Sequence, residues 1–121
     1  MWIWLNLAPE KLPLPLARAL ETSDSPFGIS SVSVWETMLT MQKGRIAVTV
    51  SPESTLRSWI QSNLLDVIPL DEEIVFLSRT LPFNHDDPAD RFIAATAYRL
   101  NARLATDDGY LRQLDWLKLF P

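Results

Sequence analysis

The fold is decided around the stretch His85-Asp-Asp-Pro-Ala-Asp-Arg91, which continues into the run Phe92-Ile-Ala-Ala-Thr-Ala97. Asp87 suits the N-cap of a helix and Pro88 suits its first position, so a helix is predicted to begin here. Asp90 then lies on the apolar face of this helix, which should pack on a sheet. A carboxylate on such a face is costly unless something binds it, which makes Asp90 a candidate metal ligand.

Outward from this helix, short apolar strands alternate with helical segments. Gly44 is suited to ending the helix before it, and Asp71 to capping the helix after it. Alternation of this kind predicts an α/β fold with a parallel sheet, in which ligands bind beyond the carboxyl ends of the strands. Helices are expected at residues 14–21, 31–42, 53–63, 71–81 and 88–100, and strands at 27–30, 67–70, 104–106 and 117–120.

The composition predicts one soluble domain over residues 1–121, with 47% hydrophobic and 21% charged residues. Neither a membrane-spanning run nor a signal peptide is recognisable, so a cytoplasmic protein is expected. The chain has no cysteine, which excludes disulfides, thiol nucleophiles and thiolate metal sites. Its net charge of −4 does not favour nucleic acid. Action on phosphates would therefore require a bound cation or a local basic patch.

Glu36 is the first of three candidate ligands in the acidic set. It is predicted to interrupt an apolar stripe near the start of the helix that follows the first strand. The alternative is a capping box, in which Ser33 caps the helix and Glu36 reaches back to it.

Asp90 and its neighbour also have structural alternatives. Asp90 follows the Asp87 cap by three residues, so it could simply favour the positive end of the helix dipole. Arg91 could pair with a neighbouring acid, steer a phosphate, or form a plain surface salt bridge.

The third candidate, Asp108, follows the predicted strand at residues 104–106. The sequence Asp107-Asp108-Gly109 is good turn chemistry after a strand. The functional alternative places one carboxylate on a metal and the Thr106 hydroxyl near a bound water or phosphate.

Carboxylates without cysteine suit Mg²⁺ or Mn²⁺, which can activate water and orient a phosphodiester. His85 is the only histidine. It could act as a general base, but a histidine in a polar loop is more often a structural hydrogen-bonding group. It is therefore not assigned to the catalytic set.

Taken in order, four stretches resemble the signature of VapC-type PIN-domain toxins: residues 29–36, 43–46, 85–95 and 104–108. The resemblance implies a PIN-like three-layer sandwich with a central parallel sheet between helices. It also implies an Mg²⁺- or Mn²⁺-dependent endoribonuclease in which Glu36, Asp90 and Asp108 hold the metal and serve catalysis. Asp107 falls at a variable position of the signature and is at best auxiliary.

The resemblance further implies an RNA substrate, a homodimer, and a cognate antitoxin that inserts a peptide near the acidic cleft. The family opens with an apolar strand that ends in Asp-Thr. Residues 1–6 look like the helix start that follows this strand, so the strand and its aspartate are not found in this sequence. Two hypotheses follow: a toxin ribonuclease, or a truncated and inactive PIN-like module that binds an antitoxin or RNA.

Overall fold

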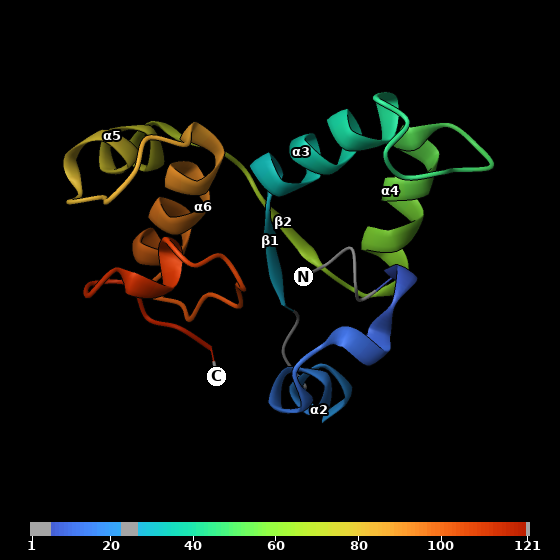
Figure 1. Cartoon of the computed structure of the whole chain (residues 1–121), viewed down its shortest axis with the longest axis horizontal. Helices are drawn as coiled ribbons and strands as arrows, with labels where there is room; N and C mark the ends of the chain where they lie inside the picture. The colour runs from blue at the N-terminus through green and yellow to red at the C-terminus, as the bar shows by residue number, and fades with distance from the viewer. Residues whose placement is uncertain (1–5, 23–26, 121) are drawn as a thin grey trace.

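The computed structural model describes residues 6–22 and 27–120. Helices and short strands alternate along the chain as predicted, and Figure 1 shows their arrangement. Two 3₁₀ turns, η1 and η2, are present in addition to the predicted elements. The elements are η1 (Pro9–Lys11), α2 (Leu14–Thr22), β1 (Gly28–Ser30), α3 (Ser31–Gln42), α4 (Pro52–Ser62), β2 (Asp66–Ile68), α5 (Glu72–Thr80), α6 (Pro88–Arg99) and η2 (Leu111–Gln113).

The parallel pairing is present, as expected for an α/β fold, and lies between β1 and β2. Gly28 pairs with Asp66 and Ser30 with Ile68. The Ile68 side chain lies against Gly28, so a Cβ built on this glycine would meet the Cδ1 of Ile68 at 2.4 Å. A larger residue at this position would therefore require the end of the Ile68 side chain to move.

The prediction of strands at residues 104–106 and 117–120 was wrong in their length. Among the described residues they form only a one-residue parallel bridge between Leu104 and Leu119. Leu104 donates to the carbonyl of Lys118 at 2.8 Å, and its own carbonyl accepts from Phe120 at 2.9 Å. Both bonds lie on one side of Leu104, and no described strand pairs with its other side. A strand extends only where a neighbour continues the ladder, so the pairing stops after one residue.

A groove of about 700 Å³ contains residues of β1 and of the segment at residues 102–106 in its lining. Leu16 and Leu20 of α2 and Ile93 of α6 supply apolar surface to it. The groove is therefore lined by residues of both parallel pairings, the one between β1 and β2 and the one at Leu104. It also brings together α3, which follows β1, and residues 105–108, which follow Leu104, at the ends of the strands where a ligand is expected in such a fold.

The best-packed part of the described chain surrounds α6. Ala94 and Ala95 are fully buried, and α5 packs along this helix. Small side chains allow such close approach between helices because little volume separates the backbones. A core cluster joins α6 to the C-terminal segment through Ala94, Ala97, Leu111, Leu114 and Leu117. Trp116 completes it with edge-to-face contacts to Phe83 and Tyr98 at 5.1 and 5.7 Å.

The predicted helix boundaries are confirmed where capping residues mark them. The Asp71 side chain accepts from the backbone N–H of Ile74 at 2.9 Å, and the Asp87 side chain accepts from that of Asp90 at 3.0 Å. Gly44 follows α3 with φ of 75°, a left-handed conformation that glycine adopts without strain. These caps fix where α5 and α6 begin and where α3 ends.

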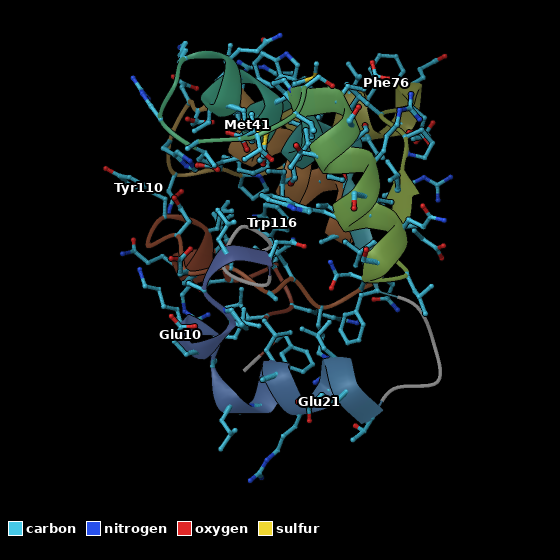
Figure 2. The ribbon with its side chains drawn as sticks, turned by 90° about the vertical axis from the view of Figure 1, so that its right-hand side faces the viewer. Glu10, Glu21, Met41, Phe76, Tyr110 and Trp116 are labelled. Carbon is cyan, nitrogen blue, oxygen red and sulfur yellow. The ribbon has the colours of Figure 1, made fainter. Side chains whose placement is uncertain are left out.

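Two views locate these elements relative to one another. In Figure 1, α5, α6 and the C-terminal segment occupy one side, and β1, β2, α3 and α4 the other. In Figure 2, Glu10 and Glu21 mark the end of the molecule formed by η1 and α2, away from Met41 of α3. None of the helices in the described residues has the length and apolar character needed to cross a membrane.

Candidate metal centre

Asp90 lies in the first turn of α6, where the sequence placed it. The Asp87 cap holds its backbone N–H, so the start of the helix fixes the direction of its side chain. The carboxylate is partly buried, with 23% of the side chain exposed, and faces the groove. Its Oδ2 lies 3.0 Å from the Nε2 of His85. The candidate ligand is thus held from both its backbone and its side chain.

Asp108 lies in a turn whose geometry follows the predicted turn chemistry. The Thr106 hydroxyl accepts from the backbone N–H of Asp108 at 3.1 Å, and Asp108 Oδ1 accepts from that of Leu111 at 2.9 Å. These bonds fix the Asp108 carboxylate, which lines the groove. They also occupy the Thr106 hydroxyl as an acceptor. Asp107 is exposed.

Within the described residues, one group of three side chains could share a metal ion. His85, Asp90 and Asp108 each offer one ligand atom, and these atoms lie within 4.8 Å of one another. All three side chains are partly buried. The structure therefore brings two of the three predicted acids together and adds the histidine.

Glu36 lies on α3 and lines the same groove, but it is not a member of this group. The capping-box alternative for it is wrong. Ser30 is the N-cap of α3, and its hydroxyl accepts from the backbone N–H of Val32 at 3.1 Å. The strand β1 ends directly at the helix, so the cap falls on the last strand residue and Ser33 lies inside the helix. Glu36 consequently lies on the second turn, free of a capping role.

The electrostatics of the site disfavour three ionised carboxylates. Burial raises the pKa of Glu36 above its ordinary value, and the nearby charges of Asp90 and Asp87 raise it further. Burial also raises the pKa of Asp90, and the His85 hydrogen bond opposes that rise while Asp108 and Asp87 reinforce it. Repulsion and desolvation of this kind are relieved by a bound cation. The donor set of carboxylate oxygens and one imidazole fits a divalent ion.

Arg91 is not directed into the groove. Its guanidinium is buried and donates from Nε to the carbonyl of Ser78 at 2.8 Å and from Nη1 to Asp86 at 2.7 Å. It also lies over the Phe83 ring at 4.6 Å. The pairing with a neighbouring acid is confirmed, but only Asp86 is exposed in that pair. Arg91 thus connects the loop before α6 to α5. Because its donors point away from the groove, the structure does not support the alternative in which Arg91 steers a phosphate.

His85 is the residue that sequence reasoning left out of the site. One signal was present: it precedes Asp90 by five residues, across the helix start marked by Asp87 and Pro88. A loop that turns at a helix N-terminus can fold back onto the first turn, but the sequence does not fix that path. The direction of the His85 ring is set by Tyr110, which is far away in sequence and stacks on it at 4.7 Å.

The fold and the acidic site together define a class of protein: an α/β domain with carboxylates converging beyond the ends of parallel strands. Comparison with known families makes the class definite. The PIN domain family matches residues 1–117. The chain therefore belongs to the PIN-domain family, and the VapC-type resemblance seen in the sequence is confirmed.

One curated relative and one solved structure are similar to this chain. Ribonuclease VapC22 from Mycobacterium tuberculosis is 27% identical over 112 residues, which cover 90% of this chain and 82% of the relative. The crystal structure of VapBC2 from Rickettsia felis, bound to a DNA fragment from their promoter, matches with a TM-score of 0.66. The match covers 98% of this chain and 91% of that chain at 18% identity, which supports the fold alone.

Proposed function

We propose that this protein is a divalent-metal-dependent endoribonuclease and the toxin component of a toxin–antitoxin system. The observation that carries the proposal is the convergence of His85, Asp90 and Asp108 within 4.8 Å. PIN-domain membership and the similarity to a ribonuclease support the reaction class. The ion is proposed to be Mg²⁺ or Mn²⁺, since hard carboxylate oxygens dominate the donor set.

The chain's own residues can be given roles in this reaction. Asp90 and Asp108 would hold the ion, and Glu36 would act from across the groove, as a further ligand or by holding the attacking water. When bound, the ion would lower the pKa of a water and stabilise charge that develops on the phosphate. Arg112 donates to the carbonyl of Thr106 at 2.9 Å, and so places an exposed positive charge beside Asp108. This charge would attract RNA to an otherwise acidic chain.

The proposed partners follow from the family and the structural neighbour. RNA is proposed as the substrate because VapC22 is a ribonuclease. A cognate antitoxin is proposed because the neighbour from Rickettsia felis is a VapBC assembly. We further propose a cytoplasmic homodimer, as the VapC-type resemblance implies.

The proposal is tested by RNA cleavage with and without Mn²⁺ or Mg²⁺. Cleavage should require the ion, stop in excess chelator, and fall by at least about 100-fold in the Asp90→Asn variant. Asp107→Asn is the matched control, because this exposed neighbour of Asp108 lies outside the group of three ligands. Cleavage that survives chelation, or that Asp90→Asn leaves unchanged, would refute the metal mechanism.

A second candidate is an inactive PIN-like module that binds an antitoxin or RNA without cutting it. The position of Glu36 outside the group of three ligands favours it, because the site then has fewer acids on the ion. Calorimetry with Mn²⁺ separates the two functions. Tight binding together with cleavage supports the enzyme, and RNA or antitoxin binding without metal binding supports the module.

A further inference from the structure

We propose that His85 is itself a metal ligand, through Nε2, alongside Asp90 and Asp108. The inference rests on the proposed metal dependence and adds a nitrogen donor to a site expected to consist of carboxylates. His85 is enclosed by its surroundings: its side chain is 12% exposed, and its ring stacks on Tyr110 with an interplanar angle of 14°. Figure 2 labels Tyr110 near one edge of the molecule.

The hydrogen bonds of Asn84 favour the His85 tautomer whose Nε2 can bind an ion. The Asn84 Nδ2 donates to the carbonyl of Tyr110 at 2.9 Å, which directs its Oδ1 towards the His85 ring. That oxygen lies 3.1 Å from His85 Nδ1 and can only accept, so this contact favours the tautomer with the proton on Nδ1. An ion bound at Nε2 would use the lone pair of that nitrogen and would replace the hydrogen bond between Nε2 and Asp90 Oδ2. Histidines that bind metals are oriented in this way, by a donor bond from the other nitrogen.

The spacing of His85 Nε2 and Asp90 Oδ2 fits adjacent ligands of one small ion. His85 Nε2 and Asp90 Oδ2 are 3.0 Å apart, and an atom of Asp108 completes a group within 4.8 Å. An octahedral ion with ligands at about 2.1 Å places adjacent ligand atoms about 3 Å apart. The three residues come from the loop before α6, the first turn of α6 and the turn before η2, so they approach one point from separate directions.

A nitrogen ligand has a chemical consequence for ion choice. Imidazole is a softer donor than carboxylate and favours transition-metal ions such as Mn²⁺ over Mg²⁺. The expected preference is therefore for Mn²⁺, and His85 is the residue that confers it. The alternative is that His85 only positions Asp90 by donating a hydrogen bond from Nε2.

The test uses the whole untagged chain loaded with Mn²⁺ and pulsed EPR, which detects a nitrogen bonded to the ion. His85 is the only histidine, so any imidazole coupling is assigned without ambiguity. We expect coupling in the unaltered chain and in Asp107→Asn, and none in His85→Gln. His85→Gln should also weaken Mn²⁺ binding by about 10-fold or more, and Mg²⁺ binding by less.

Bound Mn²⁺ without nitrogen coupling would overturn the inference, even if RNA cleavage required the ion, and would leave the proposed function intact. Absence of Mn²⁺ binding would overturn both. If His85→Gln does not fold, the spectrum of the unaltered chain still decides, because only a direct bond produces the coupling.

Discussion

The two sides of the groove present the site in different ways. On one side, the α6 half (residues 72–120) holds His85, Asp90 and Asp108 by contacts among its own residues. On the other, the β1 half (residues 28–68) contributes Glu36 from the second turn of α3. Figure 1 shows the two halves on opposite sides of the molecule. The comparison teaches that Asp90 and Asp108 are each fixed by nearby backbone groups and His85 by Tyr110 of the same half, whereas Glu36 depends on how the halves pack.

The largest effect is expected on the stability of the α6 half, from the substitution Arg91→Ala. The change removes the donors to Ser78 and Asp86 and the contact with Phe83, so the loop that carries His85 is released from α5. The free energy of unfolding should fall by about 3 kcal/mol, since a buried carbonyl loses its partner and a cavity forms.

Urea denaturation followed by circular dichroism measures this loss. Arg99→Ala, at the exposed end of the same helix, is the matched control and should change stability by less than about 0.5 kcal/mol. Equal effects of the two substitutions would mean that the α6 half does not depend on this anchor.

The next largest effect is expected on metal affinity, which should depend more on the ligand from the α6 half than on Glu36 from the β1 half. Asp90→Asn removes a charge from the locally organised group and is expected to weaken Mn²⁺ binding by about 100-fold. Glu36→Gln, from across the groove, should weaken it by about 10-fold. Isothermal titration calorimetry gives both values, and a stronger effect of Glu36→Gln would reverse the ranking of the two halves.

Removing the cap of one helix in each half should have a smaller effect on stability and should distinguish the halves by Mn²⁺ affinity. Asp87→Ala removes the cap of α6, and Ser51→Ala removes the cap of α4, where the Ser51 hydroxyl accepts from Ser54 at 3.2 Å. Each change should cost about 1 kcal/mol of stability. Only Asp87→Ala should also alter Mn²⁺ affinity, because Asp90 follows in the same turn. Thermal unfolding and calorimetry on both variants test this, and a change of affinity in Ser51→Ala would contradict it.

The smallest effect is expected in the pH dependence of stability without metal. Because the pKa values of Glu36 and Asp90 are raised on folding, their ionisation disfavours the folded state. The stability that they contribute is fully present below their ordinary values of 4.5 and 3.8 and is lost as pH rises through the raised values. Solvent screens both partly exposed groups, which keeps the effect small.

The free energy of unfolding, followed from pH 4 towards neutrality, should therefore fall more in the unaltered chain than in a Glu36→Gln, Asp90→Asn double variant. Added Mn²⁺ should reduce the difference by neutralising the acids. A steeper fall in the double variant would contradict the assigned direction of these pKa shifts.

Much of the fold was predictable because local chemistry marks it. Asp71 and Asp87 cap their helices, Gly44 follows one, and the strand before α3 lies where its apolar residues indicated. The strands near Leu104 and Leu119 were predicted too long. Apolar sequence shows that a segment can be a strand, whereas its length depends on neighbours that continue the hydrogen-bond ladder.

The candidate site divides in the same way. The sequence by itself determined the PIN-domain class, the first-turn position of Asp90 and the turn that holds Asp108, since caps and turns depend on residues three or four positions apart. Only the tertiary structure decided that Tyr110 stacks on His85, that Arg91 turns inward, and that Glu36 faces the ligand group across the groove. The reason is physical: these contacts join segments distant in sequence, and packing sets their geometry.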